Sequence, residues 1–196
     1  MLFLFIFSYL FLDERLACFL YEADIPRGLM KGLALPFTPA LHPFLWTGLF
    51  LFKRCRATLF IASSVGLTSL FSKLLKWSCG RARPYLMFED GTCGFYGFST
   101  HDPFFSFPSG HAVVAMTLAS TLAILYPKHR TPLLILGFCC SLFRVALNYH
   151  FLSDAIGGML LALCVTKGVF HYLNPLERLA HHACKKIGLP YFSPHP

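Results

Sequence analysis

The sequence predicts an all-α integral membrane protein, a bundle of about six transmembrane helices. Of its 196 residues, 56% are hydrophobic and only 13% are charged, which is far from the composition of a soluble domain of this length. Phenylalanine alone occurs 22 times, and apolar residues gather in long runs. A soluble fold would have too little polar surface to cover these runs, so we expect a membrane protein.

Six apolar runs are candidates for helices that cross the bilayer, which takes about 20 residues each. They cover residues 1–12 (with an alternative end at residue 20), 41–52, 56–77, 111–126, 132–147 and 151–172. The first run lacks the basic start and small-residue cleavage site of a signal peptide, so we expect it to be a span. No repeat or linker is visible. We therefore expect one membrane-embedded domain over residues 1–196, with its motifs between about residues 40 and 172.

Basic residues predict how the bundle is oriented. Nine of the 17 Lys and Arg residues follow the second, fourth and sixth runs, whereas eight of the nine Asp and Glu residues fall on the other side. The positive-inside rule places the basic side, and with it both termini, in the cytoplasm. The opposite side carries five cations that break the rule: Lys73, Lys76, Arg81, Arg83 and Arg144. Ionisable residues at membrane depth are costly, so such a cluster indicates a functional site.

Lys76 and Arg83 end the third run in the segment Lys-Trp-Ser-Cys-Gly-Arg-Ala-Arg-Pro. Seven residues make about two helical turns, so we expect both cations on one helix face, with Pro84 making Arg83 extended and ending the helix. Arg binds phosphate through paired hydrogen bonds, and Lys binds it as a point charge. Basic residues beside a span also commonly contact lipid head groups, and we assign Arg81 and Lys73 to that role.

The sequence Phe-Pro-Ser-Gly-His, residues 107–111, opens the fourth run. Ser109 is expected to cap the helix, Gly110 lets the backbone approach a ligand, and the free amides of the first turn bind an anion. His111 would then protonate a leaving oxygen. Taken alone, this segment equally fits an ordinary capped helix start with an interfacial histidine.

A third segment, residues 144–154, joins the last two runs and contains Arg144, His150 and Asp154. Residues four apart share a helix face, so the Asp154 carboxylate can hold one ring N–H of His150 and leave the other nitrogen as a nucleophile. Arg144 joins the site only if the helix breaks near Asn148 or the side chain reaches far. A lone His and Asp pair is more often a structural hydrogen bond than a catalytic one.

Taken together, the patterns Lys-x6-Arg-Pro, Pro-Ser-Gly-His and Arg-x5-His-x3-Asp resemble the three-part motif of the type 2 phosphatidic acid phosphatase family, which is related to glucose 6-phosphatase, bacterial acid phosphatases and vanadium haloperoxidases. The resemblance implies that His150 attacks phosphorus, Asp154 orients His150 and His111 protonates the leaving group. It also implies a set of phosphate-binding residues: Lys76, Arg83, Ser109, Gly110 and Arg144. The family usually has Ser before the third-motif Arg, where this sequence has Phe143.

The resemblance implies hydrolysis of a lipid phosphate or diphosphate through a phosphohistidine, with no metal or cofactor, because three cations neutralise the phosphate charge. Aromatic residues in the loop 85–107 favour an amphiphilic substrate at the bilayer surface. Candidate substrates are undecaprenyl diphosphate, phosphatidylglycerol phosphate, phosphatidic acid and lipid A phosphates. The small chain has no Asn-x-Ser/Thr acceptor, which fits a bacterial inner-membrane enzyme with its site facing the periplasm. No Lys or Arg run suggests nucleic-acid binding.

Three other functions remain open from the sequence: a phosphotransferase that passes the phosphoryl group to another lipid, a lipid-binding or transport protein without activity, and a haloperoxidase. The eight cysteines lack the spacing of a zinc site. Cys79 and Cys93 flank the predicted substrate loop, and a disulfide between them is one alternative in an oxidising compartment.

Overall fold

The computed structural model describes residues 2–23 and 55–186, and every named element within these ranges is a helix. Three consecutive elements form an N-terminal arm: α1 (Leu2–Phe7), the π-helix η1 (Ser8–Leu12) and α2 (Asp13–Glu22). The remaining elements are α5 (Cys55–Cys79), α6 (Pro84–Glu89), α7 (Gly110–Leu125), the 3-10 helix η4 (Pro127–His129), α8 (Arg130–Ala146) and α9 (Leu152–Lys186).

Helices occur at five of the six predicted runs, and the sixth, 41–52, lies outside the described residues. The prediction of a helical protein is therefore confirmed. Among the described residues, Leu152–Tyr172 is the one stretch that is both long and apolar enough to cross a membrane, while Gly110–Leu125 is apolar but shorter. The number of membrane spans stays a prediction.

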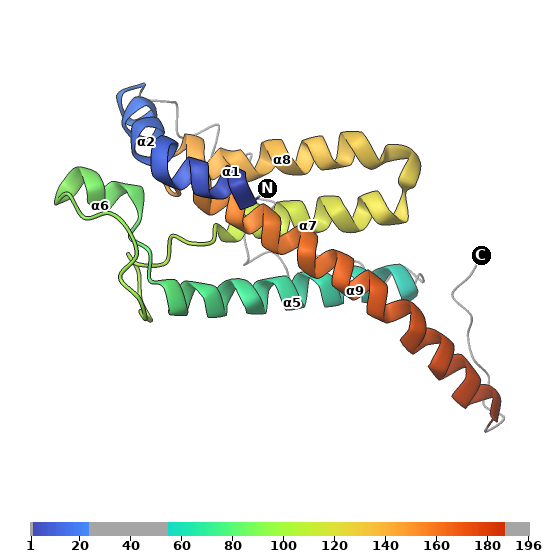
Figure 1. Ribbon diagram of the computed structural model, residues 1–196. Helices are drawn as coiled ribbons and strands as arrows, with labels where there is room; N and C mark the ends of the chain where they lie inside the picture. The colour runs from blue at the N-terminus through green and yellow to red at the C-terminus, as the bar shows by residue number, and fades with distance from the viewer. Residues whose placement is uncertain (1, 24–54, 187–196) are drawn as a thin grey trace.

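The helix α7 is the centre of the bundle and contacts α5, α8 and α9 (Figure 1). Close packing depends on small residues, because a Cβ at Gly137 would lie only 2.4 Å from the Cβ of Ala119. Hydroxyl groups also join the helices: Thr117 Oγ1 lies 3.2 Å from Thr68 Oγ1, and Ser120 Oγ lies 3.1 Å from Thr166 Oγ1. Such contacts are typical of helix packing in membranes, where small and hydroxylated residues hold helices together.

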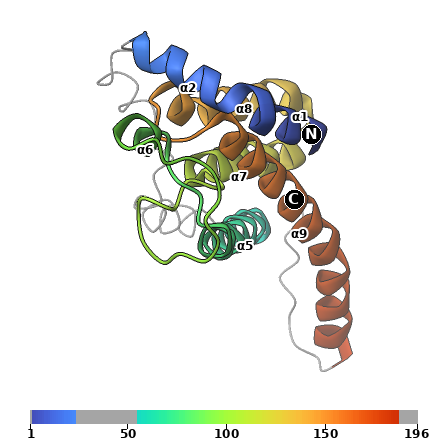
Figure 2. The same cartoon turned by 60° about the vertical axis from the view of Figure 1, so that its left-hand side comes forward.

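One end of the bundle gathers the ends of α5 and α8 and the starts of α7 and α9 (Figure 1). The N-terminal arm lies over this end (Figure 2), where Leu16 and Leu20 pack against buried residues of α7, α8 and α9. Asn148 Nδ2 also donates a hydrogen bond to Ala17 O at 2.9 Å. The opposite end contains the turn between α7 and α8 (Figure 1), with exposed Lys128 and Arg130. All three sequence motifs therefore meet at the end of the bundle that lies under the arm.

The first motif folds differently from the prediction. Lys76 and Arg83 do not share a continuous helix, because α5 ends at Cys79 and Gly80 adopts a left-handed φ of 49°. A Cβ at Gly80 would lie 1.9 Å from Gly97 O, so only glycine fits where the loop crosses this turn. Arg83 is extended and α6 begins at Pro84, as the effect of proline on its preceding residue predicted. Cys79 and Cys93 are free thiols, so the alternative of a disulfide is wrong.

Candidate active site

His150 lies in the short connection between α8 and α9, and only 4% of its surface is exposed. The helix breaks at Asn148, which has a left-handed φ of 57°, so the first of the two alternatives left open by the sequence is confirmed. The His150 Nδ1 atom faces two groups, Asp154 Oδ2 at 3.6 Å and Ser106 Oγ at 3.5 Å. The other ring nitrogen, Nε2, is therefore the one left to act on a substrate.

Electrostatics keep the His150 ring neutral. Burial lowers the pKa of His150 to about 4; the charges of Lys76 and Arg83 act in the same direction, and Asp154 acts against them. A neutral imidazole has a free lone pair on one nitrogen. At pH 7, His150 thus has the protonation state that a nucleophile needs.

Asp154 is fully buried in the first turn of α9, and three donors hold its carboxylate. Arg81 Nη1 donates to Oδ1 at 2.6 Å, whereas Ser106 Oγ and the backbone N–H of Phe151 donate to Oδ2 at 2.5 and 2.9 Å. The distance of 3.6 Å between Asp154 and His150 exceeds that of an ordinary hydrogen bond. Ser106 therefore stands beside both partners of the predicted His and Asp pair.

Ser109 precedes α7 at the N-cap position, but its side chain makes no capping hydrogen bond, so that part of the prediction is wrong. Its backbone N–H instead donates to Asp154 O at 3.0 Å, which joins the second motif to the third. A Cβ at Gly110 would meet nothing within 4 Å, so the backbone borders open space there. The start of α7 is thus open to a ligand, as the sequence predicted for Gly110.

Three buried polar atoms near the start of α7 have no hydrogen-bond partner among the described residues: Ser109 Oγ, His111 Nε2 and Arg144 Nε. Buried polar groups are ordinarily paired, so several unpaired ones in a single region need an explanation. The charges of Arg144, Lys76 and Arg83 all act on His111, so cations of the first and third motifs lie close to this residue of the second. The geometry therefore brings together the residues that the sequence singled out.

The three cations of this cluster are each in contact with a neighbour. Lys76 Nζ donates to Phe105 O at 2.7 Å, and the guanidinium of Arg144 lies 4.1 Å from the centre of the Tyr149 ring. Arg83 Nε donates at 2.8 Å to Asp102 Oδ1, whose side chain is 60% exposed. An exposed ion pair is weak, so Arg83 can exchange this carboxylate for another anion.

Arg81 does not contact head groups, and that assignment is wrong. Only 2% of Arg81 is exposed, and its guanidinium bridges two buried carboxylates, those of Asp154 at 2.6 Å and Asp13 at 2.7 Å. Burial alone would lower the pKa of Arg81, but the charges of Asp154 and Asp13 and their hydrogen bonds raise it above its usual value. Arg81 is thus a permanent buried cation behind the site.

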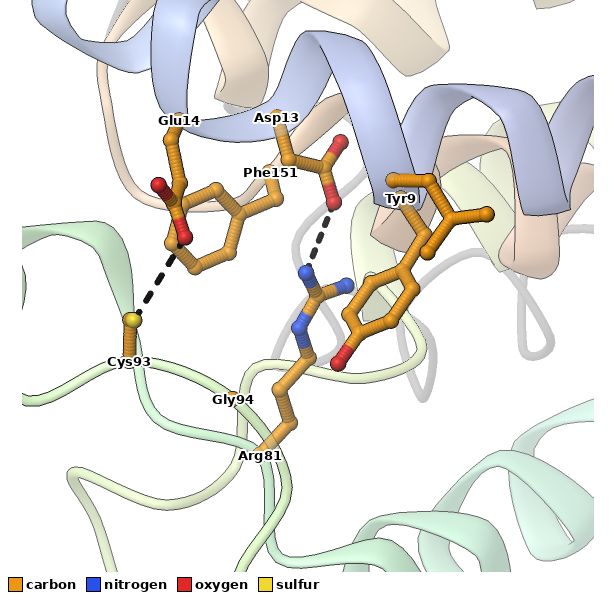
Figure 3. A pocket seen from close by; sticks show the side chains of 8 residues that line it. Tyr9, Asp13, Glu14, Arg81, Cys93, Gly94 and Phe151 are labelled. Carbon is orange, nitrogen blue, oxygen red and sulfur yellow. Dashed lines mark hydrogen bonds and ion pairs between the residues drawn. The ribbon is translucent and has the colours of Figure 1, made fainter.

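A cavity of about 320 Å³ lies between the arm and the loop that contains Cys93 (Figure 3). Its lining residues are Tyr9, Leu10, Asp13, Glu14, Arg81, Cys93, Gly94 and Phe151. Neither His150 nor His111 belongs to this lining. Cys93 Sγ lies 3.5 Å from Glu14 Oε1 at its rim.

Sequence reasoning missed Ser106, Arg81 and Asp13 as parts of this site. Arg81 and Asp13 carried only a partial signal: ionisable residues next to apolar runs are usually buried with a partner, but the sequence did not show which of the five cations on this side is the buried one. Ser106 carried no signal beyond its position one residue before the second motif. Within the described ranges, no group of three or more His, Cys, Asp or Glu side chains is arranged to bind a metal ion.

Comparison with known proteins identifies the family. Residues 57–178, more than half of the chain, match the PAP2 superfamily. The chain belongs to this superfamily. The predicted resemblance to type 2 phosphatidic acid phosphatases is thereby confirmed, and the PAP2 match contains all three motifs. The N-terminal arm lies outside the matched residues.

Curated relatives of this PAP2 chain are bacterial. It is 32% identical to lipid A 1-phosphatase of Rhizobium etli, over 58% of its own length and 45% of the relative's. The lipid A 1-phosphatase of Rhizobium johnstonii is also 32% identical, over 58% of this chain and 43% of the relative. The chain thus spans less than half of these relatives. It is 27% identical to phosphatidylglycerophosphatase B of Bacillus subtilis, over 71% of its own length and 70% of the relative's.

Two solved structures share the fold of this PAP2 chain. LpxE of Aquifex aeolicus superimposes with a TM-score of 0.64 at 21% identity, over 82% of this chain and 96% of that one. A transmembrane PAP2-type phosphatidylglycerolphosphate phosphatase of Bacillus subtilis superimposes with a TM-score of 0.58 at 22% identity, over 83% of this chain and 85% of that one. The arrangement of helices in the PAP2 chain is therefore that of known PAP2 proteins.

Proposed function

We propose that this chain is an integral membrane phosphatase that hydrolyses a lipid phosphate or diphosphate through a phosphohistidine on His150. One observation carries the proposal: Ser109 Oγ, His111 Nε2 and Arg144 Nε are buried without partners in the cluster that also contains neutral His150. A phosphoryl group supplies acceptors for all of these donors and a centre for nucleophilic attack. Its negative charge also matches the cations Lys76, Arg83 and Arg144.

The reaction would proceed in two displacements. His150 Nε2 attacks phosphorus opposite the leaving oxygen, the bond between phosphorus and that oxygen breaks, and His111 gives the oxygen a proton. Water then attacks the phosphohistidine while His111 takes back a proton, the bond between phosphorus and nitrogen breaks, and inorganic phosphate leaves. Asp154 keeps the His150 ring oriented in both steps, as the carboxylate does in a hydrolase triad.

Phosphoryl transfer depends mainly on positioning and on neutralising charge. In the proposed site, Lys76, Arg83 and Arg144 neutralise the phosphoryl oxygens, while Ser109 and the first backbone amides of α7 donate hydrogen bonds to them. These are the roles that the family resemblance implied for these residues and for Gly110.

A lipid substrate is supported by the surface beside the site. Phe95, Tyr96 and Phe98 in the loop over the first motif are 41%, 57% and 78% exposed. Aromatic rings are favoured at the boundary of bilayer and water, where a lipid head group would enter. The names of the relatives, lipid A 1-phosphatase and phosphatidylglycerophosphatase B, support a lipid phosphate as substrate.

The proposed topology has six spans in one domain, with both termini in the cytoplasm. Exposed Lys128 and Arg130 lie at the end of the bundle opposite the site, which the positive-inside rule places at the cytoplasmic face. The site then faces the periplasm or the exterior of a bacterial inner membrane.

The test is phosphate release by the purified chain in detergent micelles or vesicles, with lipid A, phosphatidylglycerol phosphate, phosphatidic acid and undecaprenyl diphosphate offered separately. We expect release from at least one of these lipids and none from His150→Ala. Mass spectrometry of the lipid product separates hydrolysis from transfer, because a phosphotransferase would yield a newly phosphorylated lipid. No release and no new lipid would refute the proposal.

The nucleophile is tested by rapid quench with a labelled, activated phosphate ester under alkaline conditions, which preserve phosphohistidine. We expect His150→Ala to form no phosphoenzyme. His111→Ala should turn over slowly yet still become labelled, because a good leaving group needs little protonation. Label on the His150→Ala variant would contradict the assignment of the nucleophile.

A further inference from the structure

Asp13 connects the N-terminal arm to the back of the active site. Only 3% of Asp13 is exposed, and its carboxylate accepts hydrogen bonds from Ser8 Oγ at 3.0 Å, the Ser153 N–H at 2.9 Å and Arg81 Nη2 at 2.7 Å, as well as from Ser153 Oγ. Ser153 is the neighbour of Asp154, and Arg81 also binds Asp154. Three contacts thus link the arm to the His150 ring: Asp13 to Arg81, Arg81 to Asp154, and Asp154 to His150.

The backbone of the arm is shaped to present this carboxylate. The π-helix η1 (Ser8–Leu12) comes directly before Asp13, and the Asp13 N–H donates to Ser8 O, five residues back. Such π segments in otherwise α-helical stretches occur frequently at functional sites, because the extra residue changes the direction of the side chains that follow. Here the change accompanies a buried carboxylate that directly follows an apolar stretch, and such a buried charge is costly unless it has a purpose.

Arg81 is the shared partner. Its Nη1 binds Asp154, and its Nη2 binds Asp13 (Figure 3). The rings of Tyr9, Phe95 and Phe151 lie 4.6 to 5.1 Å from its Cζ atom. If Arg81 faced Asp154 alone, the pair would be neutral and the field of Asp154 at His150 would be largely cancelled. With two carboxylates on one guanidinium, the group keeps a net charge of −1.

We propose that Asp13 is a positioning residue for phosphoryl transfer: it shares Arg81 with Asp154, so that Asp154 keeps the negative charge that faces His150. The inference rests on the proposed function of His150 as the nucleophile. When His150 attacks phosphorus, its ring gains positive charge, and a net negative group behind the ring stabilises that state. Through Asp13 alone, the N-terminal arm, which lies outside the PAP2 match, then contributes to the charge behind His150.

The first test is Asp13→Asn, which removes the charge and keeps the shape. We expect kcat to fall about tenfold while KM stays within about twofold, because Asp13 acts on the charge that develops at His150 and not on substrate binding. Ser8→Ala is the matched control, since it removes one hydrogen bond to Asp13 without changing any charge. Asp13→Glu keeps the charge and should retain most of the wild-type kcat.

A second test separates this role from simple anchoring of the arm. Arg81→Gln leaves Asp13 and Asp154 buried without their cation, so one carboxylate must take up a proton. Adding Asp13→Asn removes the competing carboxylate, and we expect the double variant to be more active than Arg81→Gln alone. If Asp13 only anchored the arm, the double variant would be no more active than Arg81→Gln.

Binding of orthovanadate, which would bond to His150 as phosphorus does, gives a readout independent of turnover. We expect Asp13→Asn to bind vanadate about tenfold more weakly than the wild type and Ser8→Ala to bind it equally well. If the wild type is active and Asp13→Asn has the same kcat and vanadate affinity, the inference is overturned and the proposed function stands. A fall in Asp13→Glu as large as in Asp13→Asn would also overturn it. A wild type that releases no phosphate would instead refute the proposed function, and its vanadate affinity relative to Asp13→Asn would still decide the inference.

Discussion

Ser106 offers a quantitative test of how the predicted nucleophile is held. Its side chain is fully buried, its Oγ donates to Asp154 Oδ2 at 2.5 Å, and the same Oγ lies 3.5 Å from His150 Nδ1. Ser106→Ala removes one of the donors to the carboxylate and the hydroxyl that faces the ring. The imidazole can then adopt the tautomer with its proton on Nε2, which cannot attack phosphorus.

The size of the effect follows from the type of bond. A hydrogen bond to a charged group contributes about 1.5–3 kcal/mol, and each 1.36 kcal/mol changes a rate tenfold, so complete loss in the transition state would lower kcat by about 10- to 150-fold. Arg81 and the Phe151 N–H still hold Asp154 in the variant. We therefore expect a fall of about tenfold in kcat. KM should stay unchanged, because Ser106 is not among the phosphate-binding residues.

The assay is phosphate release from the best lipid substrate, with the melting temperature in detergent measured in parallel. Ser120→Ala is the matched control: Ser120 is also a buried serine, whose Oγ bonds Thr166 in the bundle away from the site. Both variants should lose stability, and Ser106→Ala alone should lose kcat. Equal kcat in the two variants would refute the role of Ser106 in holding Asp154 and His150.

Further predictions concern pH, metals and the loop. Because the pKa of His150 is lowered from 6.5 to about 4, the nucleophile should stay neutral down to about pH 4, and the pH profile of kcat/KM should show no loss from its protonation near pH 6.5. The same shift stabilises the folded protein fully above pH 6.5, and this stabilisation is lost as the pH falls toward 4. Melting curves recorded across this pH range would show the loss. Hydrolysis should survive EDTA and be inhibited by vanadate; activity lost on chelation and restored by Mg²⁺ would contradict charge neutralisation by the protein's cations. Asp102→Asn should lower KM a few-fold by freeing Arg83 Nε, and an unchanged or higher KM would show that this pair does not compete with substrate. Gly80→Ala should prevent folding or lower the melting temperature strongly, whereas Gly66→Ala in α5, where a Cβ meets nothing within 4 Å, should be neutral or slightly stabilising.

The sequence predicted the helices and the family well because both leave local patterns. Apolar runs mark helices by their composition, and a break near Asn148 was one of two ways in which Arg144 could join the site. The end of α5 was placed wrongly because the reason for it is not local. Gly80 turns the chain where Gly97 O approaches, and these two residues are 17 positions apart. The Ser109 side chain was expected to cap α7, but it makes no capping hydrogen bond. The Ser109 backbone N–H instead donates a hydrogen bond to Asp154 O.

Arg81 and Asp13 escaped prediction for a more general reason. In a soluble protein an apolar neighbourhood implies burial, but in a membrane protein apolar residues face lipid as well as the interior, so the apolar neighbours of a cation do not show whether it is buried. In the structure, the cations at the end of the bundle under the arm differ in their partners. Arg81 is bound to two carboxylates and is therefore neutralised before any substrate arrives, whereas Lys76, Arg83 and Arg144 have only a carbonyl, one exposed carboxylate and an aromatic ring as partners. In the proposed site, three cations thus remain to bind the substrate phosphate, while Arg81, shared by two carboxylates, sets the charge behind His150.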